Sequence, residues 1–156
     1  MRVLFVCLGN ICRSPTAEGV LRELARREAP GLLAEVDSAG TADYHVGEAP
    51  DPRTCRVAAA RGYELWGLRA RQVARADFER FDLLLAMDRA NLQELQRLAP
   101  AVHRDRAQLF LPYAGHSTIA EVPDPYYGDE AGFLRVLELV EEGARGLIAR
   151  LRDQAG

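Results

Sequence analysis

A cysteine, an arginine and a serine stand close together near the amino end of the chain. Cys7 ends an apolar run, Arg13 follows after five intervening residues, and Ser14 comes next, in the sequence CLGNICRSP. A thiolate is a strong nucleophile, and a guanidinium group binds two phosphate oxygens at once. This spacing therefore indicates nucleophilic attack on phosphorus.

The residues between the cysteine and the arginine suit a loop that surrounds an anion. Gly9 permits a tight turn, and Asn10 tolerates a left-handed backbone. Successive backbone N–H groups can then converge on a phosphate, together with the free N–H groups of a following helix. The same field favours the thiolate of Cys7, to which Ser14 can donate a hydrogen bond. The expected phosphate-binding and supporting residues here are Leu8, Gly9, Asn10, Ile11, Cys12 and Ser14.

A departing ester oxygen needs a proton, and the best candidate donor lies more than a hundred residues later. Asp124 stands between two prolines in VPDPYYGD, and these stiffen the loop that positions its carboxyl group. An aspartate before proline is also common in plain turns, but the presence of Cys7 favours a general acid. The same carboxylate could later accept a proton from the water that attacks the phosphocysteine.

Strand and helix signals alternate along the chain. Strands are expected at 3–7, 32–40, 82–87 and 106–112, and helices at 51–62, 76–81, 88–100 and 130–153, with a first helix capped by Ser14 and a loop over 112–129. This alternation predicts an α/β fold, a parallel sheet with helices on both faces. Ligands bind such sheets beyond the carboxyl ends of the strands, which is where Cys7 lies.

Composition narrows the class of protein. The 156 residues suit a single domain over 1–156, and a hydrophobic content of 48% indicates a globular chain. A net charge of −3 gives no general attraction to nucleic acid or to an anionic membrane. No stretch is long enough to span a bilayer. We therefore expect neither a nucleic-acid partner nor a membrane partner.

The cysteines suggest a reducing compartment and no metal. An odd, sparse set makes a poor disulfide framework, so the expected location is the cytoplasm. The cysteines and histidines show no zinc-ligand spacing, and no carboxylate pair suggests two metals. We therefore expect a metal-free reaction without a cofactor. The three cysteines are Cys7, Cys12 and Cys55.

Four motifs together resemble the low-molecular-weight protein tyrosine phosphatases. They are VCLGNICRSPTAE, RARQV, FDLLLAMDRANLQEL and DPYYG, and they occur in the order and spacing of that family over nearly the whole chain. The resemblance implies a four-stranded parallel sheet with helices on both sides. It also implies hydrolysis of aryl phosphates, including phosphotyrosine in proteins, through a phosphocysteine, with phosphate as a product.

The resemblance assigns a role to each matching residue. It implies that Cys7 is the nucleophile, that Arg13 binds the phosphate, and that Asp124 is the general acid. It implies loop-stabilising roles for Asn10, Ser14 and Ser38, and places in the substrate cleft for Tyr44, His45, Tyr126 and Tyr127. One of the paired tyrosines is expected to form a wall for the substrate ring. Family members can be phosphorylated on these tyrosines.

The chain departs from the family pattern at Leu68. Many members carry a histidine there, hydrogen-bonded to the network around the loop asparagine. Another group or a water then supports Asn10, or packing holds the loop. We expect the site to survive, because the backbone N–H groups do not depend on that histidine. The arginines of RARQ, Arg69 and Arg71, are expected at the surface.

Cys12 also matches a family position. The resemblance implies a reversible disulfide between Cys12 and Cys7 that protects the nucleophile from over-oxidation, and an exposed thiolate does oxidise readily. The alternative is that Cys12 simply packs under the loop. The sequence does not decide between the two.

Three other activities remain as alternatives. Thioredoxin-coupled arsenate reductases share the fold and a similar loop, but they use two further redox cysteines, and only Cys55 is left here. Protein arginine phosphatases typically carry threonine where this chain has Ile11. A phosphocysteine carrier of a sugar phosphotransferase system would need neither Arg13 nor Asp124.

Overall fold

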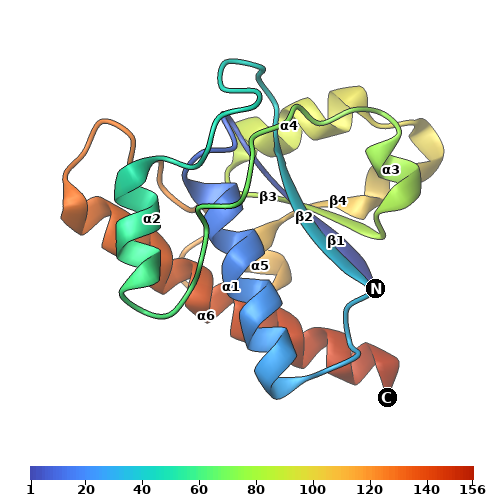
Figure 1. Cartoon of the computed structure of the whole chain (residues 1–156). Coiled ribbons are helices and arrows are strands. Elements are labelled where there is room, and N and C mark those ends of the chain that lie inside the picture. Colours follow the sequence, from blue (N-terminus) through green and yellow to red (C-terminus); the bar gives the residue numbers. More distant parts are fainter.

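The computed structural model describes residues 1–156 and contains one sheet of four parallel strands, in the order β2-β1-β3-β4 (Figure 1). The central pair is formed by β1 and β3, and Val6 of β1 lies opposite Ala39 of β2 and Ala86 of β3. The strands are β1 (Arg2–Cys7), β2 (Glu35–Gly40), β3 (Leu83–Ala86) and β4 (Ala107–Leu109).

Helices cover both faces of this sheet, as predicted. One face packs against α1, α5 and α6, with α2 packed on α6, and the other face packs against α3 and α4 (Figure 1). None of these helices is both long and apolar enough to cross a membrane. The helices are α1 (Arg13–Glu28), α2 (Pro52–Ala59), α3 (Asp77–Arg80), α4 (Arg89–Leu98), the 3₁₀ helix η1 (Ala101–Arg106), α5 (Phe110–Tyr113) and α6 (Glu130–Ala155).

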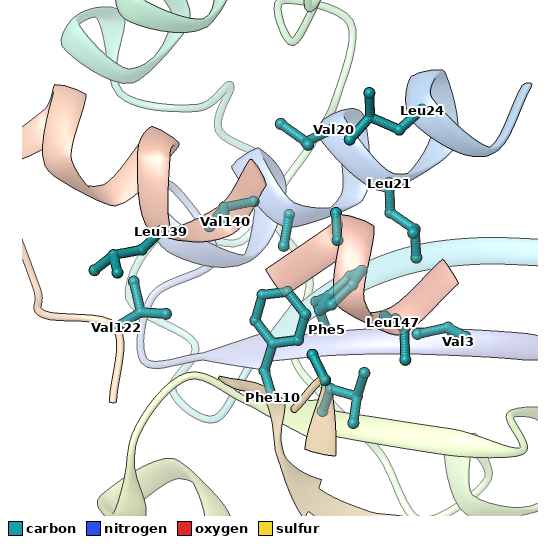
Figure 2. Packing of buried hydrophobic residues seen from close by; sticks show 14 of the residues in the cluster. Val3, Phe5, Val20, Leu21, Leu24, Phe110, Val122, Leu139, Val140 and Leu147 are labelled. Carbon is teal, nitrogen blue, oxygen red and sulfur yellow. The ribbon is translucent and has the colours of Figure 1, made fainter. Parts of the chain in front are cut away.

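The alternation of side chains along β1 builds two separate cores. Val3 and Phe5 point into the larger core beneath α1 and α6, whereas Leu4 and Val6 point into the smaller one beneath α3 and α4. Figure 2 shows the larger core, where Phe5 meets Phe110 edge to face with ring centroids 5.0 Å apart. Both faces of β1 are buried, which explains its continuous apolar run.

Aspartates begin three of the helices. The side chain of Asp51 caps α2 by accepting a hydrogen bond from the backbone N–H of Arg53. In the same manner Asp88 caps α4 and Asp129 caps α6. The predicted cap at Ser14 is wrong. The first helix begins at Arg13, with no side-chain cap, and the Ser14 hydroxyl bonds instead to Cys7 and Asn10.

The predicted last strand, 106–112, is too long. The strand β4 ends at Leu109, and the chain turns at once into the short helix α5. Phe110 and Leu111 are both fully buried, and both contact the helix α6 around Gly143. Consecutive side chains of a strand would point to opposite faces, so only a helical turn allows both residues to pack on α6.

The helix α6 approaches α5 so closely that glycine is required. A Cβ atom at Gly146 would lie 2.2 Å from the carbonyl oxygen of Ala114, which belongs to the backbone and cannot rotate away. We expect Gly146→Ala to lower the free energy of unfolding by about 1–3 kcal/mol, through overpacking. Urea denaturation measures this change.

The matched control is Gly132→Ala, on the same helix. Its Cβ atom would lie 3.8 Å from the nearest atom, in Pro125, which is an ordinary contact. Alanine favours a helix over glycine by about 1 kcal/mol, so this variant should be as stable as the parent or more so. Equal stability of the two variants would contradict the close packing of α6 on Ala114.

Candidate active site

The site lies at the point where the order of the strands in the sheet reverses. The strands β2 and β3 flank β1 on opposite sides, so the carboxyl end of β1 is the topological switch point, the usual ligand site of such sheets. Cys7 is the last residue of β1, and residues 8–12 form a loop that leads directly into α1. The thiol, the loop and a helix amino terminus are therefore brought together by local chain order alone.

A cavity of about 190 Å³ opens above this loop. An apolar cavity of about 150 Å³ can hold a benzene ring, so this one has room for an aryl group. Every residue in its lining was predicted as a site residue from the sequence. The lining consists of Cys7, Leu8, Gly9, Ile11, Cys12, Arg13, Tyr44, His45, Asp124, Tyr126 and Tyr127.

The sulfur of Cys7 lies at the floor of the cavity and is held by two neighbours. It is 3.0 Å from the hydroxyl oxygen of Ser14, and the backbone N–H of Asn10 donates to it at 3.3 Å. The backbone N–H groups of Gly9 and Ile11 make no hydrogen bond within the protein, nor does that of Arg13. Unused donors beside a thiol suit the binding of an anion.

Asn10 braces the loop from behind. Its backbone is left-handed, with φ 58°, and it is the only non-glycine residue with positive φ. Its Nδ2 atom donates to the hydroxyl oxygens of Ser14 at 2.8 Å and Ser38 at 3.0 Å, and its Oδ1 atom accepts from the backbone N–H of Arg71 at 3.0 Å. All three amide contacts are used, so the side chain has one orientation.

These bonds also direct the hydroxyl protons. Because Ser14 accepts from Asn10, its own proton is free for the sulfur of Cys7 at 3.0 Å, which is closer than the carbonyl oxygen of Ala39 at 3.4 Å. Ser14 is thus oriented to donate to a thiolate. The loop-stabilising positions Asn10, Ser14 and Ser38 lie outside the cavity and hold its floor in place.

A buried glutamate closes the network. The hydroxyl of Ser38 donates to Glu18 Oε1 at 2.6 Å, and Arg22 donates to the other oxygen of Glu18. Burial raises the pKa of Glu18, against the hydrogen bonds from Ser38 and Arg22. No residue pattern indicated this role of Glu18, because a glutamate in the first turns of a helix is explained by the helix dipole alone.

A main-chain group supports Asn10 in this chain. Leu68, at the position where the resemblance implies a histidine, is partly buried against the larger core, and the backbone N–H of Arg71 donates to Asn10 Oδ1. Arg69 is exposed, as expected, whereas the side chain of Arg71 is half-buried. Its guanidinium forms ion pairs with Asp37 at 3.1 Å and Asp77 at 3.0 Å, which fix this segment beside the loop.

Arg13 is a buried cation with a dedicated partner. Its side chain is 3% exposed, and its Nη1 atom donates to Asp88 Oδ2 at 2.7 Å and to the carbonyl oxygen of Val122 at 3.1 Å. Burial alone would lower the pKa of Arg13, but the charges of Cys7 and Asp88 outweigh it and raise that pKa. Its Nε and Nη2 atoms make no hydrogen bond within the protein and remain available to phosphate oxygens.

Asp88 therefore has two tasks, of which the sequence indicated one. Its Oδ1 atom caps α4 by accepting from the backbone N–H of Asn91 at 2.8 Å, while its Oδ2 atom binds Arg13. The capping role follows from an aspartate ahead of a helical run. The ion pair joins residues 75 positions apart and is visible only in the folded chain.

Asp124 faces the loop from the opposite wall of the cavity. Its Oδ2 atom lies 3.8 Å from Arg13 Nη2, and its side chain is 46% exposed, so the carboxyl group reaches solvent. The backbone N–H of Tyr126 donates to Oδ1 at 3.1 Å. That bond leaves Oδ2 as the oxygen that can carry a proton.

Aromatic side chains surround the opening. Tyr126 lies between His45, with ring centroids 6.3 Å apart, and Tyr127, with centroids 5.0 Å apart. The exposure of Tyr127 is 95%, against 36% for Tyr126, so Tyr126 is the better wall for an aryl ring. Tyr44 is 73% exposed, and His45 pairs with Glu48 on the outer side.

Cys12 packs beneath the loop with Ile11, Ala70 and Phe133. Burial raises the pKa of Cys12 to about 12, so its sulfur is a thiol at neutral pH. This packing agrees with the alternative that Cys12 packs under the loop. The disulfide with Cys7 stays a prediction, and its formation would require Cys12 to lose a proton against this burial.

Comparison with known proteins shows the family to which the chain belongs. The family model for low molecular weight phosphotyrosine protein phosphatase matches residues 2–155. A low molecular weight protein-tyrosine-phosphatase of Streptomyces coelicolor is 47% identical, covering 98% of this chain and 94% of the relative. The corresponding pig protein is 37% identical, covering 96% and 95%.

Solved structures that resemble this chain agree with the result of the sequence comparison. A protein tyrosine phosphatase from Entamoeba histolytica with Hepes in its active site superposes with TM-score 0.93 at 38% identity, covering 100% of this chain and 99% of the other. Wzb from Vibrio vulnificus in complex with benzylphosphonate gives TM-score 0.83 at 29% identity, covering 96% and 97%. The chain belongs to the low molecular weight phosphotyrosine protein phosphatase family.

The brace provided by Asn10 can be tested by two substitutions. Asn10→Ala removes the amide and disfavours positive φ, whereas Asn10→Gly removes the amide but keeps that backbone accessible. We expect both to lower kcat/KM for p-nitrophenyl phosphate, the alanine variant more, by roughly tenfold or greater. Full activity of the glycine variant would show that the hydrogen bonds of Asn10 are not needed.

Proposed function

We propose that the protein hydrolyses phosphotyrosine and small aryl phosphates without a metal, through a phosphocysteine on Cys7. One arrangement carries this proposal. A thiol lies at the floor of a loop with unused N–H donors, Arg13 stands beside it, and a solvent-accessible carboxyl group, Asp124, faces both across one cavity. These are a nucleophile, a phosphate-binding cation and a proton donor.

In the first step the thiolate of Cys7 attacks phosphorus while the bond from phosphorus to the ester oxygen breaks. Arg13 and the loop N–H groups hold the charge on the three phosphoryl oxygens. Asp124 transfers its proton from Oδ2 to the departing oxygen, which leaves as a phenol. The products of this step are a phosphocysteine and the Asp124 carboxylate.

In the second step a water attacks the phosphocysteine. The Asp124 carboxylate takes a proton from that water as the sulfur–phosphorus bond breaks, and inorganic phosphate is released. The sulfur leaves as a thiolate, which the hydroxyl of Ser14, 3.0 Å away, stabilises by hydrogen bonding. Cys7 and protonated Asp124 are thereby restored.

The shape of the cavity favours an aryl ester. The phosphate site is at the floor, and the walls above it are formed by Ile11, Tyr126 and His45, so a flat ring fits between the phosphate and the solvent. A relative, Wzb from Vibrio vulnificus, has been solved in complex with benzylphosphonate, which carries an aryl ring and a phosphonate group. Phosphotyrosine in a protein chain is the corresponding natural ligand.

The other activities find less support. Arsenate reduction needs further accessible thiols, but Cys55 is fully buried in α2. A larger aliphatic Ile11 at the cavity wall favours an aryl ester over a guanidino group. A phosphocysteine carrier would have no use for Asp124 facing the thiol.

We also infer that the protein works as one domain over 1–156 in the cytoplasm. Two cores share the single sheet, which supports one folding unit. A catalytic thiol must stay reduced, and a reducing compartment maintains it. Phosphotyrosine-containing proteins are then the expected partners, and neither nucleic acid nor a membrane is needed.

The assignment of nucleophile and acid is tested with p-nitrophenyl phosphate in the presence of EDTA. We expect normal turnover by the parent protein and none by Cys7→Ser. Asp124→Ala should lower kcat/KM by about 100-fold or more for phenyl phosphate, whose leaving group needs a proton, and less for p-nitrophenyl phosphate. Inhibition by EDTA would contradict the metal-free reaction, and full activity of Cys7→Ser would contradict the phosphocysteine.

The preference for aryl esters is tested by comparing substrates. We expect kcat/KM to be highest for a phosphotyrosine peptide and at least roughly tenfold lower for phosphoserine, whose short side chain cannot span the cavity. Phosphoarginine should also be a poor substrate. Release of phosphate from phosphoarginine at the rate found for phosphotyrosine would support the arginine phosphatase alternative instead.

A further inference from the structure

Arg53, in the first turn of α2, lies between the catalytic loop and the loop that carries the acid. Its Nε and Nη2 atoms bind both carboxylate oxygens of Asp51, at 3.1 and 2.9 Å. Its Nη2 atom also donates to the carbonyl oxygen of Tyr126 at 3.0 Å. The guanidinium thus bridges α2 and the segment ahead of α6, which lie side by side in Figure 1.

Two aromatic rings fix the plane of this guanidinium. Its Cζ atom lies 4.5 Å from the ring centroid of Phe133 and 5.6 Å from that of Tyr126. Phe133 is 3% exposed and packs against Ile11 and Cys12 beneath the catalytic loop. A planar cation that both stacks and forks in this way cannot be replaced by lysine without loss.

The ion pair is anchored to the catalytic loop itself. The backbone N–H of Asp51 donates to the carbonyl oxygen of Ile11 at 2.9 Å. The hydrogen bond from Arg53 lowers the pKa of Asp51, and the same bond raises the pKa of Arg53. Both groups are therefore charged throughout the neutral range.

Ahead of Asp124 the acid loop is held through Val122, whose N–H donates to Met87 and whose carbonyl oxygen accepts from Arg13. After Asp124 it has few hydrogen bonds to the rest of the chain. Within residues 125–129, the hydrogen bond from Arg53 to Tyr126 is the only one that reaches a part of the chain outside 124–132. The bonds of Gly128 and Gly132 stay inside the loop and the start of α6. Tyr126 in turn donates from its backbone N–H to Asp124 Oδ1 at 3.1 Å.

We propose that Arg53 is a positioning residue for the general acid: it clamps Tyr126 to the catalytic loop, and Tyr126 holds the Asp124 carboxyl group over Cys7. Arg53 does not line the cavity and touches no reacting atom. It acts by fixing the peptide unit whose N–H binds Oδ1. This inference rests on the proposed role of Asp124 as the proton donor.

The test measures how kcat/KM depends on the leaving group. In Arg53→Met the hydrogen bonds are lost while an apolar chain still covers Phe133. We expect kcat/KM for phenyl phosphate to fall roughly tenfold, and for p-nitrophenyl phosphate to fall by about twofold or less, because nitrophenolate departs without protonation. Arg53→Lys keeps the charge and should lie between Arg53→Met and the parent.

The matched control is Arg56→Met, on the same helix. The side chain of Arg56 is exposed and makes no hydrogen bond or ion pair, so its replacement should leave both substrates unaffected. Thermal unfolding of each variant shows whether the fold persists. Equal losses on both substrates in Arg53→Met, or no loss on either, would overturn the proposal.

A parallel measurement on Asp124→Asn separates this inference from the function on which it rests. Asp124→Asn should show the largest gap between phenyl phosphate and p-nitrophenyl phosphate. If it shows that gap and Arg53→Met does not, only the role of Arg53 is refuted. If Asp124→Asn itself shows no gap, then Asp124 is not the acid, and both proposals fall.

Discussion

A loop that binds an anion with its own backbone N–H groups cannot use them to hold itself together. Those donors must face the ligand, so the loop needs support from behind that makes no claim on them. In this protein the amide of Asn10 supplies that support, with one hydroxyl on each donor hydrogen and a backbone N–H on its oxygen. The positive φ of Asn10 is the strained conformation that this network maintains.

Arg13 is the cation around which the acidic groups of the site are arranged. One buried arginine faces three acidic groups: the thiol of Cys7, the carboxylate of Asp88 and, across the cavity, that of Asp124. Asp88 binds only the Nη1 atom of Arg13, so the guanidinium is oriented while its Nε and Nη2 donors remain free. A buried charge with a partner on one edge and free donors on the other is prepared for a dianion.

The residues that line the cavity were predictable because they lie in short contiguous motifs whose residue types suit attack on phosphorus. The residues that support them were predictable only in part: the family resemblance implied Asn10, Ser14 and Ser38, but not the others. Asp88 binds Arg13 and Glu18 binds Ser38, and each pair lies close together only in the folded chain. Arg71 contributes a backbone N–H, which cannot be predicted from the type of its side chain. For Ser14 the sequence predicts both a helix cap and a hydrogen bond to Cys7; only the second agrees with the structure, because the hydroxyl faces the sulfur and the amide of Asn10.

The hydrogen bond from the main chain of Arg71 to Asn10 has a consequence for the durability of the site. A histidine in that place would change charge near neutral pH and could be removed by any point mutation. A peptide N–H does neither: it keeps its proton across the physiological range, and among the twenty amino acids only proline lacks it. A substitution at residue 71 would therefore keep the donor group itself, although it would remove the ion pairs with Asp37 and Asp77 that hold this segment beside the loop.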